Sequence, residues 1–127
     1  LFKKFAINIK PKDYYLNKKE IKHLVSLGMI IGSHGESHTL LSGLSYEKQL
    51  KEIKNSKIFL EKIINKDVEF FSHPYGGKLT YNKNTLKILK KLEFKLAYSV
   101  EYRDISHKDI KDKPYELPRY DCNLFKY

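Results

Sequence analysis

The sequence predicts an α/β fold built on a parallel sheet, and two observations lead to this expectation. Short apolar runs suited to strands alternate along the chain with amphipathic segments suited to helices. Three of the apolar runs end in clusters of polar residues, and parallel α/β folds gather their sites at the carboxyl ends of strands. The chain has 127 residues, 41% of them apolar, so we expect a single domain over residues 1–127.

The first part of the chain is expected to contain two strands and a helix. Residues 4–9 form a short apolar run that is typical of a strand. Residues 17–28 place apolar side chains three and four positions apart, which predicts a helix that ends at Gly28. Residues 29–33 form a second apolar run, expected to be a buried strand that leads directly into two histidines.

A longer helix is expected after the histidines. Ser45 is a suitable N-cap, because its hydroxyl can accept a hydrogen bond from the first turn. Glu47 lies in that turn, where the helix dipole favours a negative charge. Lysine and glutamate fill one face of the helix. The opposite face is an apolar stripe that we expect to be buried, made of Leu50, Ile53, Phe59, Leu60, Ile63 and Ile64.

The second half continues the alternation. Residues 67–72 are expected to be a strand that is broken by the proline and glycines after it. Residues 82–92 predict a helix with an asparagine near its start as the cap, and residues 94–100 predict the next strand. The tail over residues 115–127 contains Pro118 and shows little periodicity. Parallel strands joined through helices are expected to have right-handed crossovers.

Composition argues against nucleic-acid and membrane roles. The net charge is +10, but the basic residues are nearly all lysines spread along the chain, and the only arginines are Arg103 and Arg119. Proteins that read bases and phosphates rely on arginine clusters, so a basic nucleic-acid-binding module is the less favoured alternative. No apolar run approaches the roughly 20 residues of a membrane span. Cys122 is the only cysteine, so we expect no internal disulfide.

Polar clusters follow three expected strands. They cover residues 33–38, 72–77 and 101–104. Because the carboxyl ends of parallel strands meet at one edge of a sheet, we expect these clusters to lie close together. This expected meeting supports a functional site more strongly than any one of the clusters does alone.

The first cluster contains His34 and His38, four positions apart. One helical turn can bring two such imidazoles to the same ion, and imidazole suits zinc and other divalent metals. The alternative is two exposed histidines in a polar turn. Two histidines do not complete a catalytic metal site, because a third ligand is needed.

Several ordered motifs resemble a known family. The segment MIIGSHGESHTLLSGLSYEKQLKEIKNSKIFLEKI resembles the second conserved motif of the polysaccharide deacetylases, the NodB-homology domains of carbohydrate esterase family 4. FFSHPYGG looks like the third motif, TLKILKKLEFKLAYSV like a later helix and strand, and LPRYD like a late Pro-Arg motif. The residues that match the second motif are His34, His38, Leu44, Glu52, Ile53, Ser56 and Leu60.

The resemblance implies a fold and a reaction. The fold would be a distorted (β/α) barrel of the NodB-homology type, incomplete because the first strand and its Asp motif are missing. The reaction would remove N- or O-acetyl groups from a sugar or polysaccharide, by hydrolysis of a carbon–nitrogen amide bond in the N-acetyl case. A divalent metal, zinc in many members, would polarise the acetyl carbonyl and activate water, and an aspartate would take the water's proton.

Carried over onto this sequence, the resemblance names a metal site and an acetyl pocket. His34 and His38 would be metal ligands. The turn formed by Pro74, Tyr75 and Gly76 would contact the substrate. Tyr75 would have a catalytic role, because its backbone N–H would stabilise the oxyanion.

Three further residues are candidates for the same reaction. Arg119 would act in catalysis by orienting a carboxylate, because its planar guanidinium suits bidentate pairing. Glu101 and Asp104 follow an expected strand and are candidates for contact with the sugar. The alternative for these two residues, and for Arg103 between them, is a solvated charged loop.

The sequence also departs from the family pattern. Asp13 is the only aspartate before the histidine pair, and its context matches no motif. The arginine that is usual in the third motif is here Ser72 or His73. His73 would either compensate for that arginine or simply cap the turn. The late histidine that would protonate the leaving group is missing, and His107 lies in a polar loop that is expected to be exposed.

Two accounts fit the missing motif: a truncated piece of a working deacetylase, which we favour, or a natural inactive remnant that binds carbohydrate. A barrel without its first strand would expose a sheet edge and could form oligomers through it. We expect an acetylated sugar or glycan as the substrate, no nucleic-acid partner, and a role in bacterial surface-glycan metabolism. Localisation stays open, with the bacterial cytoplasm favoured over the cell envelope.

Overall fold

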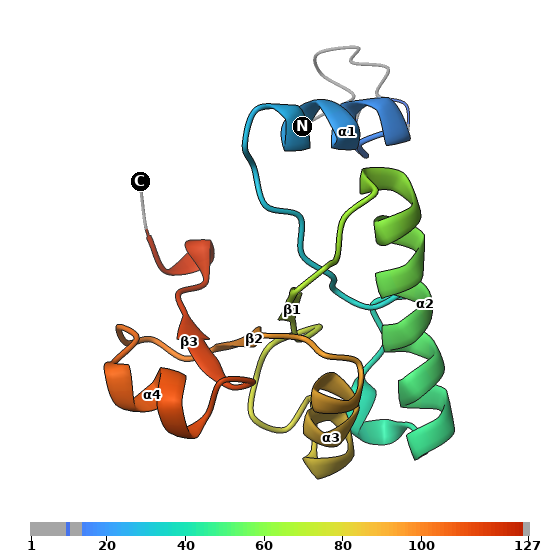
Figure 1. Cartoon of the computed structure of the whole chain (residues 1–127). Helices are drawn as coiled ribbons and strands as arrows, with labels where there is room; N and C mark the ends of the chain where they lie inside the picture. The colour runs from blue at the N-terminus through green and yellow to red at the C-terminus, as the bar shows by residue number, and fades with distance from the viewer. Residues whose placement is uncertain (1–9, 11–13, 126–127) are drawn as a thin grey trace, which may run out of the picture. The chain divides into compact units, whose positions relative to one another are not determined.

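A computed structural model describes residues 10 and 14–125 of the chain, shown in Figure 1. The predicted strand at residues 4–9 and the isolated Asp13 lie outside the described residues. The chain divides into two compact units, residues 1–30 and residues 31–127. Among the described helices, none is long and apolar enough to cross a membrane.

The described part of the first unit contains one helix, α1, over Lys18–Ser26. Asn17 caps it, because its side chain accepts hydrogen bonds from the backbone N–H groups of Lys19 and Glu20, and Glu20 bonds back to the Asn17 N–H. Gly28 follows the helix with φ of +85°, a conformation that glycine adopts without strain. The helix predicted between residues 17 and 28 is therefore confirmed, shorter at both ends.

The second unit is built around a three-stranded parallel sheet in the order β1–β2–β3. The strands are β1 Phe70–Ser72, β2 Leu96–Val100 and β3 Leu117–Arg119. Strand β1 pairs with β2 from Phe70 opposite Leu96 to Ser72 opposite Tyr98. Strand β2 pairs with β3 from Tyr98 opposite Leu117 to Val100 opposite Arg119. The predicted α/β class with a parallel sheet is thus confirmed.

Helices α2 and α3 pack against each other in this unit (Figure 1). The helices are α2 Tyr46–Ile64, α3 Lys83–Lys91 and α4 His107–Asp112, with short 3₁₀ turns at Leu41–Gly43 and Cys122–Leu124. Ser45 caps α2 as predicted, and Asn82 caps α3. The core between helices and sheet consists of Leu41, Ile53, Val68, Phe71, Ile88, Leu89, Phe94 and Ala97. Their burial is the main favourable term in folding.

Two expectations for this region were wrong. Residues 29–33 do not form a buried strand: Ser33 alone bridges to Phe71, while Met29 and Ile30 are 56% and 74% exposed. Strand β1 has only three residues, so a parallel neighbour can pair with it over only a short stretch. Phe59 is 54% exposed although it belongs to the predicted apolar stripe of α2. Gln49 and Ser56 are buried on that helix instead.

Two elements were not predicted at all. Strand β3 contains Pro118, which cannot donate to a sheet ladder, and the strand lies at an edge of the described sheet, where proline is tolerated. Helix α4 has only six residues, too few for a clear apolar period. It is instead defined by its cap, because Ser106 and Asp109 form a capping box.

Candidate functional site

The two histidines of the predicted metal site lie next to each other. The centroids of the His34 and His38 rings are 4.8 Å apart, with 65° between the ring planes. The loop that carries them begins at Ser33, whose N–H donates to the Phe70 carbonyl and whose carbonyl accepts from the Ser72 N–H, both at 2.8 Å. These bonds fix the start of the loop beside the end of β1.

The His34 ring is oriented so that its outer nitrogen has no hydrogen-bond partner among the residues that the structure describes. The Nδ1 atom lies 2.7 Å from the Ser72 carbonyl oxygen. Since a carbonyl only accepts, Nδ1 carries the proton and Nε2 keeps its lone pair, as a metal-binding imidazole requires. Partial burial of the ring lowers the His34 pKa, and the positive charges of His38 and Arg119 lower it further, while the Ser72 carbonyl acts in the opposite direction. The neutral, ligating form is therefore favoured.

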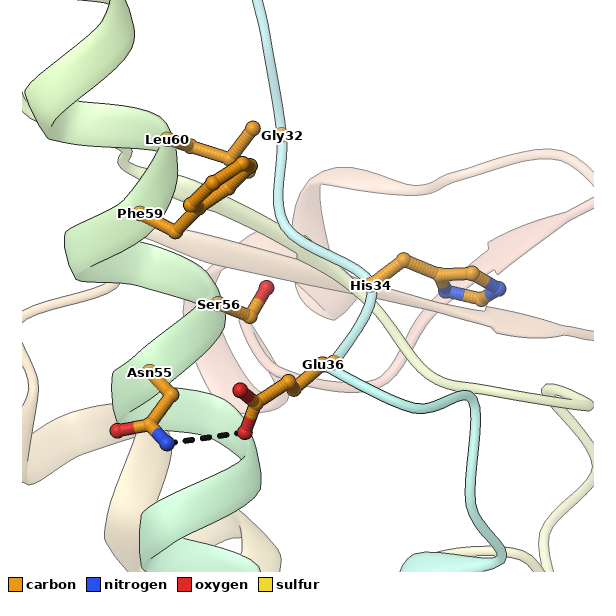
Figure 2. A pocket seen from close by; sticks show the side chains of 8 residues that line it. Gly32, His34, Glu36, Asn55, Ser56, Phe59 and Leu60 are labelled. Atoms are coloured by element: carbon orange, nitrogen blue, oxygen red, sulfur yellow. Dashed lines mark hydrogen bonds between the residues drawn. The ribbon is translucent and has the colours of Figure 1, made fainter. Parts of the chain in front are cut away.

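Helix α2 holds the other side of the histidine loop. The Ser33 and Ser56 hydroxyls are hydrogen-bonded at 2.6 Å in the interior. Glu36 accepts a hydrogen bond from the Asn55 amide at 2.9 Å, and Figure 2 shows that the His34 ring points away from this helix. The Glu36 carboxylate is therefore turned toward α2 and not toward the imidazoles.

A cavity of about 450 Å³ lies between this loop and α2. Figure 2 shows the exposed Phe59 ring beside Gly32 at one end and Glu36 with Asn55 at the other. The residues that line it are Gly32, His34, Gly35, Glu36, Asn55, Ser56, Phe59 and Leu60.

The Pro74 turn contacts the second histidine. The rings of His38 and Tyr75 meet edge to face, with centroids 4.6 Å apart. Both residues have left-handed backbone conformations, with φ of +54° for His38 and +61° for Tyr75. Side chains other than glycine rarely adopt this region, and strain of this kind is concentrated at functional sites.

A tight turn at Tyr75 presents its backbone N–H. The Gly76 N–H donates to the Pro74 carbonyl at 2.7 Å, which closes a three-residue turn around Tyr75. Within the described part of the chain, the Tyr75 N–H has no hydrogen-bond partner. This geometry is compatible with the predicted oxyanion role of that N–H.

Gly76 lets three segments approach closely. Its φ is +76°, and a Cβ atom there would lie 2.5 Å from Val100 Cγ2 and 3.0 Å from Arg119 Nη2. The Gly76 carbonyl accepts a hydrogen bond from the Val100 N–H at 2.7 Å. The Pro74 turn is thus joined to the end of β2 and reaches the arginine of β3.

Arg119 is the one predicted catalytic side chain that comes from β3. Its Nε atom is buried and has no hydrogen-bond partner in the described structure. Its charge is felt by both His34 and His73, since it lowers the pKa of each. The structure therefore brings together His34, His38, the Pro74 turn and Arg119. The first two polar clusters meet as expected, whereas Arg119 comes from a strand that was not predicted.

The residues can be compared with what a divalent metal needs. Two imidazoles side by side suit such an ion, and the His34 Nε2, which has no partner among the described residues, fits this role. In residues 10 and 14–125, no group of three or more His, Cys, Asp or Glu side chains could hold a metal. For a divalent metal, the two histidines alone would be an incomplete ligand set.

Glu101 and Asp104 each pair with residues other than the two histidines. Glu101 forms ion pairs with Lys78 and Arg103, each at 3.3 Å, and these neighbours lower its pKa. Asp104 accepts a hydrogen bond from the Tyr120 hydroxyl at 3.1 Å. Their predicted contact with a sugar stays a prediction.

His73 is part of the interior. Its ring is fully buried, stacks on Tyr81 at 3.9 Å and lies 2.8 Å through Nε2 from the Tyr115 carbonyl. Burial is the main cause that lowers the His73 pKa to about 4, and the charges of His34 and Arg119 add to it. We therefore interpret His73 as a neutral structural side chain. His107 begins α4 and is exposed, as expected.

Sequence reasoning missed the partners that position the site. Ser33, Ser56 and the Ser72 carbonyl orient the histidine loop, and Tyr81 supports the Pro74 segment through His73. Ser56 belongs to the quoted motif, which is a signal for its position but not for its contact. The hydrogen bond between His34 and the Ser72 carbonyl cannot be predicted from residue types, because every residue has a backbone carbonyl whatever its side chain.

Comparison with known proteins gives consistent matches. A model of the family described as "Polysaccharide deacetylase" matches residues 4–97. The putative polysaccharide deacetylase YxkH of Bacillus subtilis (strain 168) is 27% identical over 88 residues, which cover 69% of this chain and 30% of that protein.

Solved structures resemble the chain as well. The Streptococcus pyogenes deacetylase PplD in complex with acetate has a TM-score of 0.75 and 28% identity, over 83% of this chain and 44% of that one. BC0361, a polysaccharide deacetylase from Bacillus cereus, has a TM-score of 0.73 at 24% identity, over 89% of this chain and 34% of that one. BA3943 from Bacillus anthracis, a CE4 family pseudoenzyme, has a TM-score of 0.57 at 18% identity, over 64% and 28%. The chain thus spans less than half the length of each of these relatives.

Proposed function

This chain belongs to the polysaccharide deacetylase family, and on that premise we propose that it provides part of the active site of a metal-dependent sugar deacetylase. The predicted NodB-type fold is confirmed by the solved relatives, of which the chain spans a part. The proposed reaction is hydrolysis of an N- or O-acetyl group on a sugar or glycan.

One observation carries the proposal: His34 and His38 lie together, and His34 has its Nδ1 proton engaged and its Nε2 lone pair free. Both histidines are exposed, as the alternative of a polar turn also requires, but a ring held through Nδ1 with Nε2 available is the arrangement that a ligating imidazole needs. The carbonyl that fixes the His34 tautomer belongs to the strand that leads into the Pro74 turn, so the metal pair and the acetyl pocket are positioned by the same backbone. Such outer partners set ring orientation and ligand basicity.

The chain's own residues then have defined roles. A divalent ion such as zinc, when bound, supplies Lewis-acid polarisation of the acetyl carbonyl and lowers the pKa of water. His34 and His38 hold it. The Tyr75 N–H donates to the oxygen on which negative charge develops. Pro74 and Gly76 keep that N–H in place through the bond that closes the turn.

The reaction also needs a carboxylate to accept the proton of water and a third metal ligand. In the described part of the chain, no further His, Cys, Asp or Glu completes a metal-binding group with the histidine pair. We therefore propose the activity for a protein in which groups beyond these residues complete the site. The same need leaves a second candidate, a carbohydrate-binding protein without activity, which the resemblance in fold to a pseudoenzyme supports.

Metal titration with matched histidine variants tests the proposal. We expect the chain to bind zinc at one ion per molecule, measured by calorimetry. His34→Ala and His38→Ala should each weaken binding by about tenfold or more, since each removes one ligand. His107→Ala, on exposed α4, is the matched control and should leave affinity unchanged. Equal affinity in all four proteins would remove the basis for the metal site.

Activity separates the two candidates. Acetate release from N-acetylated chitin oligomers would be measured with zinc for the longest polypeptide that contains this chain. The enzyme should release acetate, and His34→Ala should abolish that release. Binding of the oligomers without release would favour the carbohydrate-binding alternative.

A further inference from the structure

Glu52 of helix α2 binds the loop that carries the two histidines. Its carboxylate accepts two hydrogen bonds from Ser37, one from the backbone N–H at 3.0 Å and one from the hydroxyl at 2.8 Å. One carboxylate oxygen also lies 3.9 Å from the point where a Cβ of Gly35 would stand, so the carboxylate packs against the loop itself. Hydrogen bonds to an ionised carboxylate are roughly twice as strong as neutral ones. Glu52 therefore fixes the residue directly before His38.

The Ser37 hydroxyl extends this connection to the other side of His38. Its oxygen lies 2.6 Å from the Thr39 hydroxyl. Because Ser37 donates its hydrogen to Glu52, the hydrogen of this second bond comes from Thr39. The residues before and after His38 are thus connected to one carboxylate, and hydrogen bonds in such a chain strengthen one another.

The backbone of His38 needs support of this kind. Its φ is +54°, in the left-handed region that side chains other than glycine rarely adopt. Such a conformation persists only where the surrounding structure imposes it. With a relaxed backbone, the side chain would leave the loop in another direction, and its ring would no longer lie 4.8 Å from the ring of His34.

Helix α2 makes two further contacts with the loop, and both lie farther from the second histidine along the chain. Ser56 is hydrogen-bonded to Ser33, and Asn55 donates to Glu36 (Figure 2). These loop residues stand five and two positions before His38. Asn55 is therefore a matched control, because its substitution loosens the same loop from the same helix and keeps the bonds on both sides of His38.

We propose that Glu52 is a positioning residue for metal binding, because it holds the backbone at His38 so that this ring faces His34. The inference rests on the proposed function for the identity of the ion that the histidines bind. Glu52 acts through its hydrogen bonds to Ser37 and not through its negative charge. This distinction separates positioning from a simple attraction between a carboxylate and a cation.

Zinc titration by calorimetry distinguishes the two modes of action. Glu52→Ala removes both bonds to Ser37 and should weaken zinc binding by about tenfold, as the loss of an outer partner does at other metal sites. Glu52→Gln removes the charge but keeps the shape. Its oxygen can accept from the Ser37 N–H and its amide can donate to the Ser37 hydroxyl, so it should keep nearly the affinity of the wild type. Asn55→Ala should keep it as well.

NMR of the metal-free protein gives a second readout. In the wild type and in Glu52→Gln, we expect a nuclear Overhauser effect between the rings of His34 and His38, since their centroids are 4.8 Å apart. Glu52→Ala should lose this effect, and its Ser37 amide should exchange faster with water. Ser37→Ala keeps the N–H bond but breaks the link to Thr39, so it should weaken zinc binding less than Glu52→Ala does.

Unchanged zinc affinity and an unchanged ring contact in Glu52→Ala would overturn the inference. Equal losses in Glu52→Ala and Glu52→Gln would overturn it in favour of charge, and an equal loss in Asn55→Ala would reduce Glu52 to general support of the loop. If Glu52→Ala does not fold in urea-free buffer, Glu52→Gln and Ser37→Ala carry the test. A wild type that binds no zinc would remove the proposed function, while the ring contact in metal-free protein still decides the role of Glu52.

Discussion

His38 and Tyr75 meet edge to face with their ring centroids 4.6 Å apart, and both residues have left-handed backbones. The contact joins the histidine loop to the Pro74 turn at the point where each is most strained. For residues other than glycine, this conformation costs about 1–2 kcal/mol each. The surrounding hydrogen bonds therefore have to impose it.

We expect substitution of Tyr75 to reveal this balance. Tyr75→Gly relieves the backbone strain but loses the ring contact, worth about 0.5–1.5 kcal/mol, so stability should change by less than about 1 kcal/mol. Tyr75→Val loses the contact and keeps a β-branched side chain at φ of +61°, so it should be clearly less stable than Tyr75→Gly. Urea unfolding measures both, and equal stability of the two variants would mean that strain is absent.

Gly76→Ala should destabilise the protein by about 2–4 kcal/mol. The new Cβ would lie 2.5 Å from Val100 Cγ2 at a φ of +76°, so overpacking and backbone strain add. Gly43→Ala is the matched control, since a Cβ there meets no atom within 4 Å, and it should cost far less. Similar midpoints of urea unfolding for the two variants would contradict the close approach at Gly76.

The Ser33–Ser56 hydrogen bond should show strong coupling. Ser56→Ala leaves the buried Ser33 hydroxyl without its side-chain partner and should cost about 1–3 kcal/mol. Ser33→Ala/Ser56→Ala removes both groups, and its cost should fall below the sum of the two single variants. A double-mutant cycle from urea unfolding measures the coupling, and strictly additive values would argue that the two hydroxyls do not interact.

His73 should make the protein sensitive to mild acid. Its pKa falls from 6.5 to about 4 on folding, so the neutral ring is favoured in the folded state. That contribution is complete above about pH 6.5 and is lost as the pH falls toward 4, by up to about 3 kcal/mol. The measurement is the free energy of unfolding in urea at pH 7 and pH 4.5. His73→Phe should flatten this dependence over that interval, whereas His107→Ala should not.

Local signals in the sequence were sufficient to predict α1, α2 and α3 and the meeting of the histidine loop with the Pro74 turn. Ser45 was recognised as a cap because capping depends on neighbours within four residues. Strand β3 escaped because Pro118 argues against a strand, and only its position at the sheet edge makes it acceptable. Phe59 was assigned to the core by periodicity, but whether a stripe is covered depends on what packs against it.

The candidate site, like the fold, could be predicted from the sequence only in part. His34 and His38 could be found from their spacing and from the motif around them, and the structure places their rings together. The role of the Ser72 carbonyl could not be found, since it depends on a contact across 38 positions of the chain. Nor could the sequence tell that Lys78 forms an ion pair with Glu101, because only folding brings these two residues together.

The contacts between the histidine loop and α2 have a thermodynamic consequence. The helix holds this loop at Ser33, at Glu36 and at Ser37, whose hydroxyl donates to Glu52 at 2.8 Å. The conformational entropy of the loop is thus given up when the protein folds, not when an ion arrives. Preorganisation of this kind lets association retain more of its intrinsic affinity. The loop beside the candidate site therefore has its shape before any ligand binds, and we expect ligands that do not fit this shape to bind weakly.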